Sequence, residues 1–343
     1  MDIRAFYEDC MYGQWRCNEK VSYLLGQENE LKIFVEANGK KVSFNTKLFL
    51  PEPETAKWFG GKNPFIVCMH PIRPKDYALS EGYAVIELDT LEVARDDCRH
   101  EGKFYELYPY GSDPKSQTGV LMAWAWNASK ILDAVEAGLG DEVGLDINAA
   151  MVTGVSRWGK ATAVSGAFEK RFACVIPSCS GAGGLALNNV VSEGNTYDFS
   201  AIGGPKDYTY TKNEPLDCLQ SEAERGWFND YYLNYKTYAD IPVEQYELIN
   251  LAAAKDRFYY IIASAMGEDW VNAPAMWECY LRANETYEEQ GIGDNLIIHV
   301  HKEGHAVLEE DLKLLFPYFE KNHYGFDRAV DMDKLKTSIF AKQ

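Results

Sequence analysis

The chain has 343 residues, of which 46% are hydrophobic, 13% aromatic and 25% charged, and its formal net charge is −18. This composition excludes a disordered or fibrous protein. The acidity argues against a nucleic-acid partner, because neutralising phosphates requires a basic surface. No run of about 18 apolar residues occurs, so we expect no membrane partner.

The N-terminal residues contain no basic segment followed by an apolar stretch, so the chain as given is expected to be cytoplasmic. A signal peptide removed beforehand would make the protein secreted instead. The eight cysteines form no zinc-type CxxC pairs, and we expect reduced thiols and no metal site.

Two antiparallel strands are predicted first, at residues 31–37 and 41–50, on either side of a turn-like sequence at 38–40. Beyond them, hydrophobic periodicity indicates strands that alternate with helices. The predicted strands are 64–70, 82–90, 147–156, 172–181, 257–265 and 296–305, and the predicted helices are 117–137, 160–170 and 306–322. This alternation is typical of a mostly parallel sheet with helices on both faces.

The segment 182–235 interrupts the alternation. It is rich in Gly, Asn, Tyr and Asp and is too long for a simple connection. We therefore expect one domain over residues 1–343, with a substrate-covering insertion at 182–235.

The sharpest motif is GVSRWGK at residues 154–160, where a predicted strand meets a predicted helix. A nucleophile elbow needs small residues around its serine, because the strained turn brings strand and helix backbones together. The usual pattern is GxSxG, and here the second glycine comes one position later. The motif predicts Ser156 as a nucleophile, with a purely structural Gly-x-Ser turn as the alternative.

A serine nucleophile needs a base, which usually lies on a loop after the last strand. His305 occupies that place, between the predicted strand 296–305 and the closing helix. His299 and His301 alternate along the strand and are expected on one of its faces. His70, at the end of an earlier strand, is a second candidate for the pocket.

The acid of a triad is expected in a loop after another strand. Glu268 and Asp269 follow the predicted strand 257–265, which gives the order serine, acid, histidine of α/β-hydrolases. From position alone, either carboxylate could orient the imidazole.

VTGVSRWGKATAVSGAF followed by IPSCSGAGG resembles the glucuronoyl esterases, carbohydrate esterase family 15. The resemblance continues through WFNDYYLNY and GEDWVNAP to the EGH sequence that holds His305, over more than half of the chain. It implies an α/β-hydrolase fold, a three-layer αβα sandwich. It also implies cleavage of the ester between lignin alcohols and the 4-O-methyl-glucuronic acid branches of xylan, by a serine triad without metal or cofactor.

Several roles follow from the resemblance. Ser156 is implied as the nucleophile, His305 as the base and Arg157 as an oxyanion donor. The residues implied to bind the sugar ester are Lys160, Glu193, Trp227 and Trp270. Lysine and glutamate suit the hydroxyl rim of a sugar, and tryptophan suits its C–H face. Without the resemblance, Lys160 would be read as solvent-facing, and the two tryptophans as core residues.

The sequence departs from the family in two places. Many members have the triad acid at the position of Cys179, and a thiol cannot orient an imidazole as a carboxylate does. Some bacterial members instead have an acid two residues before the pocket tryptophan, which favours Glu268 over Asp269 here. Val155 and Ala306 occupy the positions where many members have a disulfide, so we expect none.

Three functions remain open from the sequence. The first is an esterase acting on esters of glucuronic acid. The second is a carbohydrate esterase of shifted specificity, acting on acetyl or feruloyl sugar esters. The third is a catalytically impaired carbohydrate-binding homologue, an alternative that Cys179 keeps open.

Overall fold

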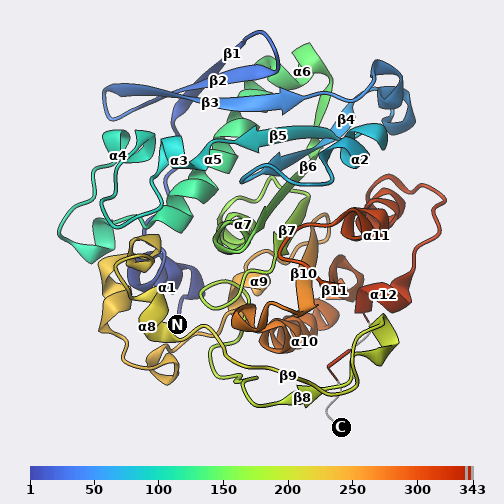
Figure 1. Cartoon of the computed structure of the whole chain (residues 1–343). Helices are drawn as coiled ribbons and strands as arrows, with labels where there is room; N and C mark the ends of the chain where they lie inside the picture. Colours follow the sequence, from blue (N-terminus) through green and yellow to red (C-terminus); the bar gives the residue numbers. More distant parts are fainter. Residues whose placement is uncertain (337–338, 341–343) are drawn as a thin grey trace.

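A nine-stranded sheet runs through the middle of the molecule (Figure 1). The computed structural model describes residues 1–336 and 339–340. The strand order is β1-β2-β3-β5-β4-β6-β7-β10-β11. The strands are β1 (Lys20–Leu25), β2 (Glu30–Ala37), β3 (Lys40–Phe49), β4 (Asn63–Cys68), β5 (Ala84–Leu88), β6 (Leu145–Val155), β7 (Cys174–Ser178), β10 (Phe258–Met266) and β11 (Leu296–Glu303).

The sheet begins antiparallel and continues parallel. β1, β2, β3 and β5 pair antiparallel, and the pairs from β5 through β4, β6, β7 and β10 to β11 are parallel. Every predicted strand is therefore confirmed. The sequence reading missed β1, whose residues are alternately exposed and half-buried and give a weak hydrophobic signal.

Helices cover both faces of the sheet, which confirms the predicted three-layer architecture. Figure 1 shows α5 (Val120–Ala134) and α7 (Arg157–Phe168) on one side, and α2 (Lys75–Ser80) and α11 (Glu309–Phe319) on the other. The remaining α-helices are α1 (Ile3–Cys10), α3 (Thr90–Val93), α4 (Lys103–Leu107), α6 (Gly140–Val143), α8 (Leu216–Leu219), α9 (Tyr246–Asn250), α10 (Ala273–Glu289) and α12 (Met332–Lys336).

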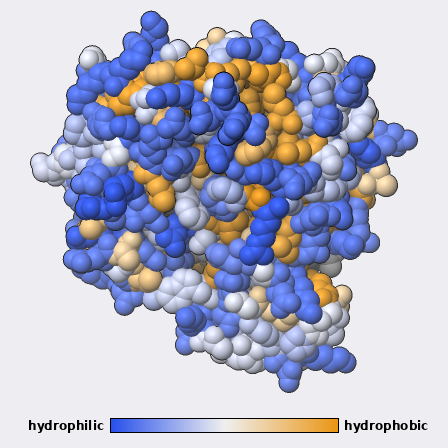
Figure 2. Space-filling view, turned by 45° about the horizontal axis from the view of Figure 1, so that its top comes forward, coloured by the Kyte–Doolittle hydropathy of each residue, from blue (hydrophilic) through white to orange (hydrophobic). Residues whose placement is uncertain are grey.

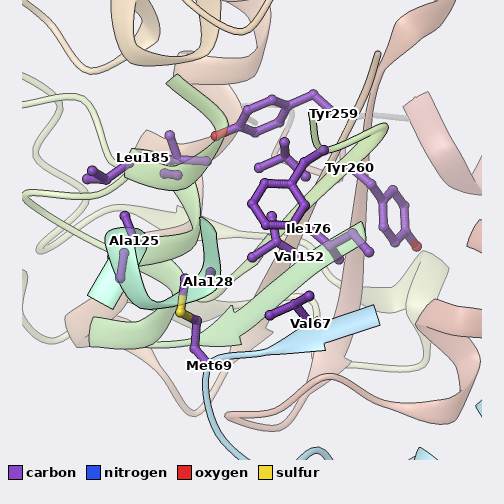
Figure 3. Packing of buried hydrophobic residues seen from close by; sticks show 14 of the residues in the cluster. Val67, Met69, Ala125, Ala128, Val152, Ile176, Leu185, Tyr259 and Tyr260 are labelled. Atoms are coloured by element: carbon purple, nitrogen blue, oxygen red, sulfur yellow. The ribbon is translucent and has the colours of Figure 1, made fainter. Parts of the chain in front are cut away.

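The hydrophobic core extends over both faces of the sheet, and α5 contributes a large part of it. This helix is apolar almost all round, as a fully buried helix must be, and 14 of its 15 residues are buried. Figure 3 shows Val67, Val152 and Ile176 of three neighbouring strands packed together, with Ala125 and Ala128 of α5 nearby. The rigid sheet holds the turns at the carboxyl ends of its parallel strands, where α/β enzymes place their sites.

Between β7 and β10 the chain leaves the alternating pattern. This segment contains a two-stranded antiparallel sheet, β8 (Thr196–Tyr197) with β9 (Tyr208–Thr209), and several single turns of 3₁₀-helix. Figure 1 shows β8 and β9 below the main sheet, next to α10.

Figure 2 shows hydrophilic residues over much of one face, with hydrophobic residues gathered in a band across its upper part. Within the described part of the chain, no helix has the length and apolar character needed to cross a membrane. All eight cysteines are free in the structure.

Candidate active site

Ser156 lies on the tight turn from β6 into α7. Its backbone has φ +62° and ψ −125°, a conformation that a non-glycine residue adopts only under strain. The Ser156 N–H donates to the Ser178 carbonyl at the end of β7, at 3.0 Å. The turn is therefore tied to the neighbouring strand.

The two glycines of the motif allow this turn to form. A Cβ at Gly154 would clash with the Trp158 backbone, and a Cβ at Gly159 would clash with the Ser178 carbonyl oxygen. The second glycine is thus needed at position 159, because that residue of α7 passes closest to β7. The spacing that departs from GxSxG serves the same close approach of strand and helix.

Arg157 follows the serine as the first residue of α7. Its Nη1 bonds to Asp96 Oδ2 at 2.5 Å, and its guanidinium carbon lies 5.4 Å from the centre of the Trp227 ring. Its Nε is buried and has no hydrogen-bond partner among the described residues. The N–H groups of the first turn of a helix also have no intrahelical partner. Donors without partners among the described residues therefore lie immediately after the serine.

His305 and Glu268 are brought together from loops after β11 and β10. His305 Nδ1 lies 3.1 Å from Glu268 Oε2, and the two side chains are 35% and 29% exposed. Asp269 faces elsewhere: its carboxylate accepts hydrogen bonds from the Tyr208 hydroxyl at 2.6 Å and from the N–H and hydroxyl of Thr211, both at 2.8 Å. Of the two candidate acids, only Glu268 is paired with the histidine.

Ser178 joins the serine turn to the histidine loop. Its carbonyl accepts the Ser156 N–H, and its hydroxyl donates to the Ala306 carbonyl at 3.2 Å. Ala306 directly follows His305. The nucleophile turn and the loop of the base are therefore anchored to the same residue.

Cys179 contacts His305. It occupies the position where the family resemblance implies an acid, which this chain lacks there. It is 1% exposed and its backbone has a positive φ of +44°. Its contact with His305 raises the pKa of the imidazole above the usual range and outweighs the opposite effect of burial. The Cys179 thiol thus contacts the His305 imidazole. In family members with an acid at this position, a carboxylate would orient that imidazole.

His70 is fixed as a neutral imidazole. Its Nδ1 donates to the Pro71 carbonyl at 2.7 Å, and its Nε2 accepts the Val155 N–H at 3.2 Å. One donor and one acceptor require the neutral ring, and burial also lowers the pKa of His70. Together with Trp158, His70 lines a cavity of about 460 Å³. His70 supports the serine turn rather than standing as a free base.

Lys160 is buried, not solvent-facing. Its ammonium group donates to the carbonyls of Ser180 and Ala182 at 2.9 and 2.6 Å and to Glu214 Oε2 at 2.9 Å. An ammonium has three donors, so these acceptors use all of them. The sequence reading missed Glu214, because only the fold brings it to a lysine 54 positions away.

The remaining predicted sugar-binding residues lie in different surroundings. Trp227 is buried, and its indole N–H donates to Asp96 Oδ1 at 2.7 Å. Trp270 is half-buried, and its ring faces the Lys212 ammonium at 4.9 Å. Glu193 is exposed and lines a separate cavity of about 340 Å³ with Glu214.

Glu224 is a further residue that the sequence reading missed. Its Oε2 is buried without a hydrogen-bond partner among the described residues. Burial, followed by the charge of Glu214, raises its pKa, whereas the charges of Lys160 and Arg157 oppose the rise. Glu224 lies three positions before Trp227 in the sequence, outside any motif that signals a role.

A strained serine at a strand–helix turn, with a histidine–carboxylate pair after later strands, is the arrangement typical of the α/β-hydrolase fold. A family model described as fungal glucuronyl esterase matches residues 33–291. The chain belongs to the glucuronoyl esterase family.

Individual relatives support the same family assignment. The chain is 41% identical over 99% of its length to a multidomain esterase of Ruminococcus flavefaciens, covering 45% of that protein. It is 27% identical to a 4-O-methyl-glucuronoyl methylesterase of Hypocrea jecorina, over 78% of this chain and 52% of that one. The chain thus spans about half the length of these curated relatives. A family 15 glucuronoyl esterase structure from Caldicellulosiruptor kristjansonii matches with a TM-score of 0.88 and 32% identity, over 100% of this chain and 88% of that one.

Proposed function

We propose that the protein is a serine esterase that hydrolyses esters of glucuronic acid or 4-O-methyl-glucuronic acid, such as the links between lignin and glucuronoxylan. The observation that carries the proposal is the His305–Glu268 pair, at 3.1 Å, on a loop anchored through Ser178 to the Ser156 turn. The names of the curated relatives supply the substrate class.

In the proposed reaction, Ser156 Oγ attacks the ester carbonyl while His305 takes the hydroxyl proton. Glu268, bonded to Nδ1, stabilises the imidazolium that forms. The imidazolium then gives its proton to the leaving alcohol, and the acyl group stays on Ser156. A water molecule, activated by the same histidine, releases the glucuronic acid and restores the enzyme.

The charge that develops on the carbonyl oxygen is met by the donors after the serine. These are the first backbone N–H groups of α7 and the guanidinium of Arg157, whose side chain is 40% exposed. Asp96 and Trp227 hold the Arg157 guanidinium in place. Because these donors are ordered before substrate binds, they require little rearrangement during the reaction.

The sugar is proposed to lie beneath the insertion at 182–235, against Trp227 and Trp270. Lys160 contributes indirectly, because its three hydrogen bonds fix Glu214 and two backbone carbonyls. Glu224 has a buried carboxylate oxygen without a described partner and is therefore a better candidate than the exposed Glu193 to accept a sugar hydroxyl.

The alcohol half is proposed to use the cavity of about 460 Å³ beside His70 and Trp158. Its lining includes the apolar side chains of Met69, Leu88 and Leu91. Apolar walls of this kind suit an aromatic alcohol. A lower KM for benzyl than for methyl glucuronate supports this placement, and equal KM values count against it.

The test compares benzyl glucuronate with 4-nitrophenyl acetate, for the wild type and for Ser156→Ala. The proposal expects rapid hydrolysis of the uronate ester that is lost in the variant. Turnover of acetate alone would favour an esterase of shifted specificity. No turnover of either ester by folded protein would favour a carbohydrate-binding homologue.

A further inference from the structure

A buried cluster of titratable groups on β11 and α11 has no role in the proposed mechanism. His299 and His301 on β11 both face Asp311 of α11, and all three are buried. His299 Nδ1 lies 2.7 Å from Asp311 Oδ1, and His301 Nδ1 lies 3.2 Å from the same oxygen. Asp311 Oδ2 accepts the Leu308 N–H at 2.7 Å.

The hydrogen bonds of His301 determine its charge. Its Nδ1 faces a carboxylate oxygen, and its Nε2 lies 2.8 Å from the Gly304 carbonyl oxygen. Both partners can only accept, so both ring nitrogens must carry a proton, whereas a neutral imidazole carries one. Burial opposes this charge, but the contacts with Asp311 and Cys179 raise the pKa of His301 to about 10.

Asp311 supplies the matching negative charge. Burial opposes its ionisation, but hydrogen bonds from His299 and His301 outweigh burial and hold the pKa of Asp311 below its usual range. Cys179 contacts the imidazoles of both His301 and His305, and the ring of His299 lies 6.2 Å from that of His301. Asp311 and His301 therefore form a buried ion pair close to His305, the proposed base.

The carbonyl that His301 binds belongs to the residue just before His305. Gly304 has a φ of +125°, so the chain turns sharply into the base at this point. On the other side, the Ala306 carbonyl accepts the Ser178 hydroxyl at 3.2 Å. The residues on both sides of His305 are thus held by hydrogen bonds. The His301 imidazolium holds Gly304, and the Ser178 hydroxyl holds Ala306.

We propose that His301, kept as an imidazolium by Asp311, is a positioning residue that fixes the loop carrying His305. Asp311 bonds to His301, His301 bonds to the Gly304 carbonyl, and the next residue is the base. The inference rests on the proposed function only in taking His305 as that base.

A metal ion is the competing use of the same side chains, because His299, His301 and Asp311 offer ligand atoms within 4.8 Å of one another. In the structure, however, each histidine directs Nδ1 at the same carboxylate oxygen at hydrogen-bond distance. Hydrogen bonds from both histidines and a metal ion bound to the same atoms are mutually exclusive, and incubation with zinc distinguishes them.

The experiment uses His301→Leu, with His299→Leu as the matched control. Both changes remove one donor to Asp311 from the same strand, but only His301 bonds to Gly304. The proposal expects kcat on benzyl glucuronate to fall about 100-fold or more in folded His301→Leu, at a nearly unchanged KM. His299→Leu should lose thermal stability but keep kcat within a few-fold. Equal losses of kcat in the two variants, or none in His301→Leu, would overturn the proposal.

The labelling rate of Ser156 with a fluorophosphonate probe separates this proposal from the substrate assignment. The rate depends on the base and not on a uronate ring, so it should fall in His301→Leu even if uronate esters are not substrates. Wild-type ¹⁵N NMR of the imidazole rings covers the case in which the variant does not fold. Both nitrogens of His301 should stay protonated from about pH 6 to 8. A bare ring nitrogen in that range, or bound zinc in the wild type after incubation with zinc, would overturn the proposal.

Discussion

At the scale of single residues, the neighbours Glu268 and Asp269 have different surroundings and should behave differently when changed. In the proposed mechanism Glu268 orients His305 and stabilises its imidazolium, so Glu268→Gln should lower kcat about 10³-fold or more. Asp269→Asn instead weakens the hydrogen bonds from Tyr208 and Thr211 and should mainly reduce stability, by about 1–3 kcal/mol. Steady-state kinetics and thermal unfolding of both variants test this. A greater loss of kcat in Asp269→Asn would contradict the assignment.

The pH dependence reports on the contact between His305 and Cys179. A histidine can act as a base only when neutral, and contact with Cys179 raises the pKa of His305, the proposed base. Activity should therefore appear only as pH rises through a value above the ordinary histidine pKa of about 6.5. In Cys179→Ala, the acidic limb of kcat/KM should move to lower pH. An unchanged limb would show that the thiol does not act on the base.

A residue of the candidate site can be predicted when the pattern that points to it lies within a short stretch of sequence. Ser156 and His305 stand in short motifs beside strands, so chain order alone predicts both. Glu214 and Glu224 have no such motif, since their positions depend on how the insertion folds over α7. The choice of Glu268 over Asp269 came from the family resemblance and stays a prediction; in the structure Glu268 Oε2 lies 3.1 Å from His305 Nδ1.

At the scale of elements, the approach of α7 to β7 should tolerate no side chain at Gly159. Gly159→Ala places a methyl group against the Ser178 carbonyl and should lower the free energy of unfolding by about 1–3 kcal/mol. It should also lower activity, because Ser178 anchors both the serine turn and the histidine loop. Gly111→Ala is the control, because a Cβ there meets only Ser116 Oγ at 3.4 Å. Urea unfolding curves compare the two, and equal stabilities would contradict the packing argument.

The elements of the sheet were predictable because buried strands alternate with helices along the chain. The sequence reading missed α10, although nine of its 17 residues are buried. Its apolar residues are interrupted by charged ones, and its N-terminus follows the irregular loop after Glu268. The start of α7 was predicted three residues late, because the elbow places the helix directly after the serine.

At the scale of the whole molecule, the net charge of −18 bears on which substrates the protein binds well. A glucuronoxylan polymer with free uronates is also an anion, so long-range repulsion should oppose its binding at low ionic strength. Raising salt toward about 0.15 M shortens the Debye length to about 8 Å and should lower KM for the polymer several-fold. Benzyl glucuronate has no charge, and its KM should change little. Equal salt dependence for both substrates would contradict this.

The most direct test of the account is whether the glucuronoyl group becomes attached to Ser156 during turnover. Wild-type protein is mixed with benzyl glucuronate, quenched in acid within the first turnovers, digested and analysed by mass spectrometry. The account predicts a glucuronoyl adduct on the peptide that contains Ser156, and no adduct and no hydrolysis in Ser156→Ala. An adduct on another residue, or hydrolysis that persists in Ser156→Ala, would contradict it.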